Sequence, residues 1–244
     1  MPTERRVPEL YSQAMFCGGC GHGVLVRLIC ECIMELGLEK RTIATNGVGC
    51  SCHLKTAINC DIVQAPHGRA AAVATGIRRA EKDMFVFSYQ GDGDAYNIGL
   101  AETLNAAYRN ENICVFVVNN SNFGMTGGQM SWCTMPGQIT ATSPMGRDAA
   151  LTGEPIKVPE MIAQSFKPAY VARGAVTTPA EINRLKGYIR NAMEAQLNHE
   201  GYSLVEVLSA CPTNLYMSPE QAIARLKNEV VPYYQLGEFK KRGV

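Results

Sequence analysis

The sequence lacks any long apolar segment. Its longest purely apolar run, "ICVFVV" at residues 113–118, is far shorter than the roughly 20 residues that a membrane-spanning helix needs. The opening residues, "MPTERRVPEL", contain no apolar core of the kind that secretory signals have. From these two absences we expect a cytoplasmic protein that makes no use of a membrane.

The chain also has almost no net charge and no repetition. The chain has 23 Lys and Arg and 22 Asp and Glu, which leave a net charge of +1. This balance gives no reason to expect a basic surface that binds nucleic acid or anionic lipid. We find no internal repeat and no low-complexity tract. We therefore expect an ordinary globular protein that does not bind nucleic acid.

Strands and helices alternate along the chain. Apolar runs predict strands at 41–46, 84–89, 113–118, 169–174 and 203–208, and helical patterns occur at 24–36, 68–82, 96–110, 159–166 and 179–198. The strand at 84–89 is apolar on both faces, as expected when helices cover both sides of a sheet. This order predicts an α/β fold, a doubly wound and mostly parallel sheet with helices on both faces.

The length of 244 residues predicts one large domain over 1–244, with an N-terminal cysteine segment and a C-terminal extension. A second full domain of the same size would not fit. The segment from Asn119 to Pro159 is the irregular part, and it contains the single tryptophan, Trp132. Irregular segments this long are usually functional or disordered, and the aromatic content here favours function.

Two acidic residues stand among glycines directly after a predicted strand. Asp92 and Asp94 follow the strand at 84–89, and Asn120 follows the strand at 113–118. A right-handed crossover places the carboxyl ends of these strands at the same edge, so Asp92 and Asn120 are expected to face one small volume. Carboxylate and amide oxygens suit Mg²⁺, which leaves about three positions for phosphate oxygens and water. Gly91 and Gly93 would let a diphosphate approach the backbone closely.

Taken alone, "GDGD" is more simply read as a turn. Together with the downstream "VVNN" it resembles the thiamine diphosphate motif of thiamine-dependent enzymes. The resemblance implies that Asp92 and Asn120 bind Mg²⁺ through their side chains, and Asn122 through its backbone carbonyl.

The ten cysteines need a separate explanation, because grouped thiols in a reducing compartment usually serve metal or redox chemistry. We assign Cys30, Cys32 and Cys114 to the core, because they lie in apolar patterns. The C-x-x-C of Cys17 and Cys20 is by itself ambiguous between zinc, a redox dithiol and an iron–sulfur site. Two further cysteines follow predicted strands and are expected at the same edge as Asp92, namely Cys50 and Cys211.

The full set of motifs, "CGGCGHG", "GVGCS", "HGRAAAVATG", "GDGDAYNIGL", "VVNNSNFGMTGGQ" and "ACPTN" in that order, resembles the thiamine-binding β subunit of the 2-oxoacid:ferredoxin oxidoreductases. The resemblance covers nearly the whole chain and implies a thiamine diphosphate-binding fold. It implies one [4Fe–4S] cluster bound by Cys17, Cys20, Cys50 and Cys211. Cys50 is preferred over Cys52 as third ligand, and the roles of Cys52, Cys60 and Cys133 stay open.

The resemblance also implies cofactor contacts that the residue types alone do not specify. These contacts comprise the turn Val48, Gly49, Cys50 and Ser51, together with His67, Gly91, Gly93, Asp94, Gly124 and Met125. His67 and Arg69 would act on the reacting carboxylate or a phosphate, although capping of the next helix is an equal alternative. His22 would only cap the first helix through its backbone.

The implied reaction is oxidative decarboxylation of a 2-oxoacid with coenzyme A, passing two electrons to ferredoxin. Implied partners are α- and γ-type subunits, one of which supplies the pyrimidine side of the cofactor site, and a ferredoxin-like δ subunit. His53, close to Cys50, favours 2-oxoglutarate as substrate, with surface exposure of this histidine as the alternative reading.

Two other hypotheses remain at this point. One is the subunit of a non-redox thiamine diphosphate-dependent decarboxylase with a structural zinc site, and the other is a non-enzymatic iron–sulfur or zinc scaffold. A zinc-containing decarboxylase would be colourless, whereas an iron–sulfur enzyme is brown and bleaches with dithionite. Release of thiamine diphosphate on denaturation would distinguish either enzyme from the non-enzymatic scaffold.

Overall fold

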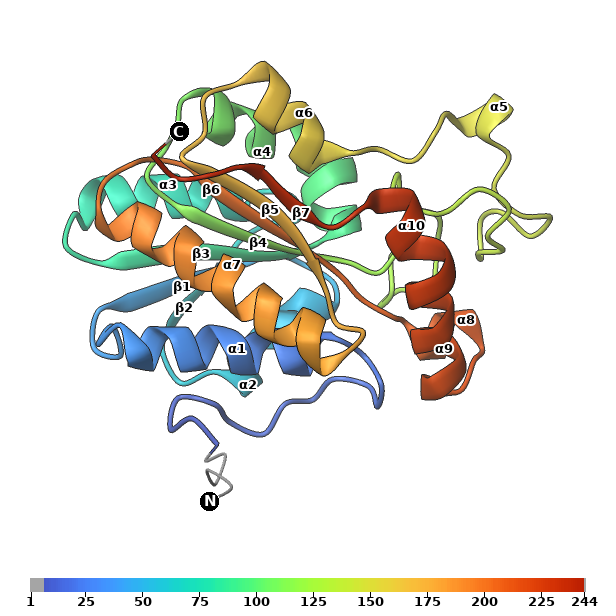
Figure 1. The fold of residues 1–244 in the computed structure, drawn as a ribbon, viewed down its shortest axis with the longest axis horizontal. Coiled ribbons are helices and arrows are strands. Elements are labelled where there is room, and N and C mark those ends of the chain that lie inside the picture. Colours follow the sequence, from blue (N-terminus) through green and yellow to red (C-terminus); the bar gives the residue numbers. More distant parts are fainter. Residues whose placement is uncertain (1–6, 244) are drawn as a thin grey trace.

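A computed structural model describes residues 7–243, and its sheet has seven strands. Figure 1 shows this sheet between two layers of helices. The strand order is β2-β1-β3-β4-β6-β5-β7, and every pair is parallel except β5 with β7. The prediction of a doubly wound, mostly parallel sheet is therefore confirmed. The first six residues of the opening segment, on which the signal-sequence expectation rests, lie outside the described residues.

The central strands agree with the predicted ones to within two residues at each end. The strands are β1 (Thr42–Asn46), β2 (Asp61–Gln64), β3 (Phe85–Gly91), β4 (Cys114–Asn119), β5 (Tyr170–Ala175), β6 (Ser203–Leu208) and β7 (Gly237–Lys240). The sequence reading missed β2 and β7. Both are four-residue edge strands with no buried residue, so they carry no apolar run to detect.

The main helices also lie where they were expected. They are α1 (His22–Glu35), α3 (Ala70–Ala80), α4 (Leu100–Tyr108), α6 (Val158–Ser165) and α7 (Pro179–Leu197). Short helices were not predicted, namely α2 (Leu54–Ala57), α5 (Ala149–Thr152), α8 (Pro212–Leu215), α9 (Pro219–Arg225) and α10 (Val231–Tyr234). A π-helical turn, Gly93–Ile98, precedes α4, and such turns often accompany functional sites.

The two faces of the sheet form two separate cores. Phe85, Phe87 and Phe116 pack with α1 and α7, whereas Val86 and Val115 pack on the opposite face with α3, α4 and α6. Successive residues of one strand thus enter different cores, which explains why the central strands carry apolar residues on both faces. Cys30, Cys32 and Cys114 are fully buried in the first core, as predicted.

Among the described residues, no helix is both long enough and apolar enough to cross a membrane.

The irregular segment that follows β4 is ordered by its own polar contacts. It runs from 120 to 157 with only α5 as regular structure, and it gathers beyond the carboxyl ends of the strands (Figure 1). The buried guanidinium of Arg147 donates to the carbonyl oxygens of Thr134 (2.6 Å), Trp132 (3.0 Å) and Gly153 (2.9 Å). One side chain therefore cross-links three turns of the segment, and the alternative of a disordered loop is wrong.

Arg147→Ala should loosen this segment without unfolding the sheet. The change leaves several carbonyl groups without a donor, and hydrogen bonds to charged groups contribute about 1.5–3 kcal/mol each, so we expect a loss of about 2–4 kcal/mol in the free energy of unfolding. Urea titration and limited proteolysis within residues 130–155 measure it. Arg184→Ala, which removes an exposed i,i+3 pair with Glu181, is the matched control, and equal effects of the two changes would contradict the prediction.

Candidate functional site

A cavity of about 110 Å³ opens at the carboxyl ends of β1, β3 and β4. Its wall contains most of the residues predicted to contact the cofactor: Val48, Gly49, Cys50, His67, Gly91, Asp92, Gly93, Asp94, Asn120, Asn122, Gly124 and Met125. His22, Phe123 and Thr126 complete the wall. Because parallel strands end at one edge, three separate motifs of the sequence meet here.

Asp92 is buried at the floor of this cavity. Its carboxylate accepts hydrogen bonds from the Ser131 hydroxyl and, at 3.4 Å, from the Asn120 backbone amide. Burial raises the pKa of Asp92 to about 7, against the opposing effect of these hydrogen bonds. In the described part of the chain no Lys, Arg or His forms an ion pair with it. A buried carboxylate in this position favours binding of a cation.

The amide of Asn120 faces two oxygens at once. One of its terminal atoms lies 3.0 Å from Asp92 Oδ1 and 2.8 Å from the backbone oxygen of Asn122. With the nitrogen on this side, the amide donates to both oxygens. With the oxygen on this side, three oxygens converge at the spacing of about 3 Å that adjacent ligands have around Mg²⁺. A cation can therefore be accommodated by rotating one amide.

Two glycines let chain segments approach each other at this floor. A Cβ atom on Gly93 would lie 2.4 Å from the Phe123 ring, which is too close for any other residue. A Cβ atom on Gly124 would lie 3.1 Å from the Cys50 sulfur and 3.4 Å from the Asn120 amide nitrogen. Gly124 thus separates the cysteine side of the site from the Asp92 side.

Asp94 binds protein groups from three segments. Its buried carboxylate accepts from the backbone amides of Val48 (3.2 Å) and Gly68 (2.8 Å), and from the Gln90 side chain. It also pairs with Nδ1 of His67. These bonds join the turn after β1 to the segment before α3, so Asp94 shapes the cavity wall, and its predicted contact with the cofactor stays a prediction.

Three residues predicted to contact the cofactor or the substrate lie off the cavity wall, namely Arg69, Ser51 and His53. The guanidinium of Arg69 pairs with Glu102 on α4 and is half exposed, while its backbone carbonyl accepts from Val73 at the start of α3. This placement favours the capping alternative for Arg69. Ser51 is buried behind the turn, and His53 lies edge-on to Phe16.

The four predicted cluster cysteines come together from distant parts of the chain. Burial raises the pKa of Cys20 to about 11 and of Cys50 to about 12, and in both cases the neighbouring thiols raise it further. Cys50 interacts in this way with Cys20, Cys211 and Cys17, and also with Cys52. In the described residues no three Cys, His, Asp or Glu side chains are arranged to hold a single metal ion. The four thiols influence one another electrostatically, and their binding of a multinuclear cluster stays a prediction.

The unassigned cysteines fall in different places. Cys52 belongs to the edge of this group, whereas Cys60 lies near Cys30 and Asp61, away from it. Cys133 is fully buried in the second core. The structure therefore leaves Cys52, and not Cys60, as the alternative to Cys50.

Comparison with known proteins agrees with this geometry. Residues 47–207 match the thiamine pyrophosphate enzyme C-terminal TPP binding domain. The 2-oxoglutarate synthase subunit KorB of Archaeoglobus fulgidus is 33% identical, and the alignment covers 93% of this chain and 84% of that protein. The chain belongs to the 2-oxoacid:ferredoxin oxidoreductase family. Its matched region is a thiamine diphosphate-binding domain, as the sequence motifs implied.

Other members of the oxidoreductase family differ in length and named substrate. The ketoisovalerate oxidoreductase subunit VorA of Methanothermobacter thermautotrophicus is 43% identical over 98% of this chain, and the chain spans about half (50%) of its length. The solved 2-oxoglutarate:ferredoxin oxidoreductase from Magnetococcus marinus has a TM-score of 0.80 at 25% identity, covering 99% of this chain and 87% of that one. The structural likeness therefore extends over nearly the whole chain.

Sequence reasoning on the oxidoreductase motifs missed two polar residues of the site. His22 is buried, and its Nδ1 lies 2.7 Å from the Tyr89 hydroxyl, while the ring also borders the cavity. Burial lowers the pKa of His22 to about 3, so the ring is neutral. Its position directly after the C-x-x-C was the available signal. Ser131, the donor to Asp92, lies in the irregular segment and carried no signal of its own.

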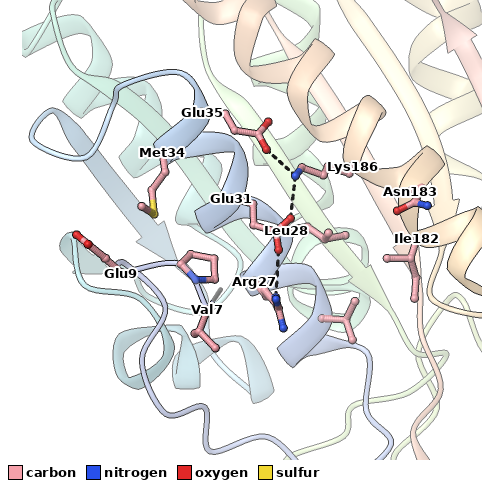
Figure 2. A pocket seen from close by; sticks show the side chains of 12 residues that line it. Val7, Glu9, Arg27, Leu28, Glu31, Met34, Glu35, Ile182, Asn183 and Lys186 are labelled. Atoms are coloured by element: carbon pink, nitrogen blue, oxygen red, sulfur yellow. Dashed lines mark hydrogen bonds and ion pairs between the residues drawn. The ribbon is translucent and has the colours of Figure 1, made fainter. Parts of the chain in front are cut away.

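A larger cavity of about 740 Å³ lies elsewhere on the molecule, between α1, α7 and the N-terminal segment (Figure 2). Glu31 pairs there with Arg27 (3.1 Å) and Lys186 (2.8 Å), and Glu35 pairs with Lys186 (2.6 Å). The groove lies along the helices, away from the carboxyl ends of the strands where ligands of α/β sheets bind. We therefore place the candidate site at the smaller cavity.

Proposed function

We propose that this chain is the subunit of a 2-oxoacid:ferredoxin oxidoreductase that binds thiamine diphosphate, Mg²⁺ and a [4Fe–4S] cluster. The complex would catalyse coenzyme A-dependent oxidative decarboxylation of a 2-oxoacid and pass the electrons to ferredoxin. The observation that carries the proposal is the juxtaposition at Gly124, where Cys50 of the thiol group and the Asn120 amide approach the same glycine. Electron transfer between two cofactors requires this proximity.

The proposed magnesium ligands are Asp92 Oδ1, Asn120 Oδ1 and the backbone oxygen of Asn122. Their fit is supported by the Asn120 amide atom, which lies within about 3 Å of both other oxygens, and by the burial of Asp92 without a cationic partner among the described residues. The remaining positions would be taken by diphosphate oxygens and water. The cation thereby lets an anionic cofactor bind beside a carboxylate.

The proposed cluster ligands are Cys17, Cys20, Cys50 and Cys211. The Cys17–Cys20 turn packs on Pro212 and Pro219 through Gly19, which brings it next to Cys211. The amide of Gly21 donates to the Ser209 hydroxyl at 3.0 Å, so the N-terminal segment is tied to the end of β6. Raised thiol pKa values show that ionisation of Cys20 and Cys50 needs a cationic partner, and an iron cluster provides one.

Bound thiamine diphosphate would supply the carbanion-stabilising chemistry, while the protein orients it and excludes water. Asp94 and His67 hold the cavity wall in one conformation. Met125, which is 43% exposed at the rim, would support the bent cofactor. His67 would face the reacting carboxylate or a phosphate, whereas Arg69, which pairs with Glu102 outside the cavity, would cap α3 through its backbone carbonyl.

A partner subunit would complete the site. The cavity of about 110 Å³ is well below the roughly 300–1,000 Å³ of sites that enclose a drug-sized ligand, so it accepts only the diphosphate end of the cofactor. Large apolar side chains are exposed on the irregular segment and on the turn after α8, namely Met125, Trp132, Ile139, Met145, Leu151, Tyr216 and Met217. Such a set is typical of a protein interface. We propose that an α-type subunit covers it and supplies the pyrimidine side.

The test is an assay of the complete complex. Reduction of a viologen dye should require a 2-oxoacid, coenzyme A and thiamine diphosphate, and the protein should be brown and bleach with dithionite. A panel containing 2-oxoglutarate and ketoisovalerate, the substrates named for its relatives, would identify the oxoacid. A colourless protein with thiamine-dependent decarboxylation and no dye reduction would support the decarboxylase with structural zinc instead.

The chain alone should not turn over. Reconstituted with iron, sulfide, Mg²⁺ and thiamine diphosphate, it should reduce viologen at less than about one hundredth of the rate of the complex, because half of the cofactor would lack its protein surroundings. The same assay measures both preparations. Comparable rates would refute the need for a partner.

A further inference from the structure

An ion network centred on a fully buried Arg–Glu pair lies directly behind the proposed magnesium site. Arg173 on β5 and Glu206 on β6 are cross-strand neighbours, both are 0% exposed, and the guanidinium donates to the Glu206 carboxylate. The outer side of the guanidinium donates to Glu160 of α6, at 2.6 and 2.7 Å. Buried pairs of this kind are costly to desolvate and weak evidence for stability, so a role other than stabilisation is worth testing.

The free oxygen of Glu206 connects the network to the magnesium turn. It accepts a hydrogen bond from the Asn119 side-chain nitrogen at 3.1 Å, and the Asn119 side-chain oxygen, Oδ1, accepts from the backbone amide of Ser121 at 3.1 Å. Ser121 has a φ of +63°, the left-handed region that a non-glycine residue adopts only when its surroundings hold it there. Asn120 and Asn122 flank Ser121 on both sides.

This connection fixes the orientation of two proposed ligands. If the Ser121 peptide rotates, the Asn122 carbonyl and the Asn120 side chain turn away from Asp92 together. Glu206 also lies close enough to Asp92 to act on it electrostatically. Glu160 and Glu206 both pair with the guanidinium of Arg173, so two carboxylates face one positive charge behind this floor.

We propose that Glu206 and Asn119 are positioning residues for the divalent cation: they contact neither cation nor cofactor, and they hold the Asn120–Asn122 turn in the conformation that presents its oxygens. The inference rests on the proposed function. Partners behind metal ligands commonly account for about 10–100-fold in metal affinity. Glu206→Gln and Asn119→Ala should each weaken cation binding within that range.

Glu160→Gln is the matched control. It removes a carboxylate from the same guanidinium but leaves the Glu206–Asn119 bond in place. Both glutamate variants should lower the melting temperature of the metal-free protein, because each weakens a bond to buried Arg173. Only Glu206→Gln should also weaken cation binding. Asn119→Ala removes no charge and provides the decisive measurement if Glu206→Gln fails to fold.

The experiment titrates Mn²⁺, as a paramagnetic substitute for Mg²⁺, into the purified complex with thiamine diphosphate, and electron paramagnetic resonance measures the free Mn²⁺. We expect the dissociation constant to rise at least tenfold for Glu206→Gln and Asn119→Ala, to change less than threefold for Glu160→Gln, and occupancy to recover at higher Mn²⁺. An Asp92→Ala variant, which lacks a proposed ligand, should lose Mn²⁺ binding and shows that the assay reports the proposed site. If it does so, unchanged affinity in Asn119→Ala, or equal weakening in Glu160→Gln, overturns the positioning role and leaves the proposed function standing. Absence of cofactor-dependent Mn²⁺ binding in the wild type overturns the proposed function as well.

Discussion

Replacing Asp92 by alanine should abolish retention of Mg²⁺ and thiamine diphosphate while the fold and the iron content stay largely intact. The carboxylate is the one charged ligand in the proposed magnesium set, and its loss should exceed the 10–100-fold effect of residues behind the ligands. The fold should tolerate the change, because burial already raises the pKa of Asp92 to about 7. Folding therefore works against the ionised side chain.

Magnesium and thiamine analysis of the purified variant measures this effect, with circular dichroism for the fold. Asp61→Ala is the matched control, because Asp61 is an exposed aspartate on edge strand β2 and its loss should leave cofactor content unchanged. Wild-type cofactor occupancy in the Asp92 variant would exclude Asp92 as the magnesium ligand.

Cys211→Ser should cost the complex its cluster iron, although Cys211 lies almost two hundred positions after Cys17 in the sequence. Serine is a hard ligand and a poor replacement for a soft thiolate. The Cys211 thiol lies in contact range of the Asn214 amide, at 3.5 Å, and interacts with both Cys20 and Cys50. Removing one of four thiolates should leave the cluster incomplete and open to solvent.

Iron and sulfide analysis, with the electron paramagnetic resonance spectrum of the reduced protein, measures the loss. Cys60→Ser should retain the cluster, because Cys60 lies near Cys30 and away from the group. Cys52→Ser should retain it as well if Cys50 is the third ligand. Four irons and four sulfides in Cys211→Ser, with unchanged redox behaviour, would make Cys52 the fourth ligand.

The predicted strands illustrate why so much of the fold was readable. β3 and β4 are buried on both faces, so each places apolar residues at consecutive positions, Phe85–Phe87 in β3 and Cys114–Val118 in β4. The edge strand β7 has no buried residue and pairs in the opposite direction. Its position depends on contacts with β5 more than sixty residues earlier, and short-range patterns carry no record of such contacts.

The same distinction applies to the site. Sequence alone determined the family, the parallel sheet and the motifs of Asp92 and Asn120, because helical period, strand burial and backbone approach through glycine act over a few neighbouring residues. Only the tertiary structure placed Ser131 on Asp92, turned Arg69 toward Glu102, and set Glu206 behind Asn119. Each of these contacts joins segments distant in the chain, and its partner is chosen by the packing of the whole domain rather than by local spacing.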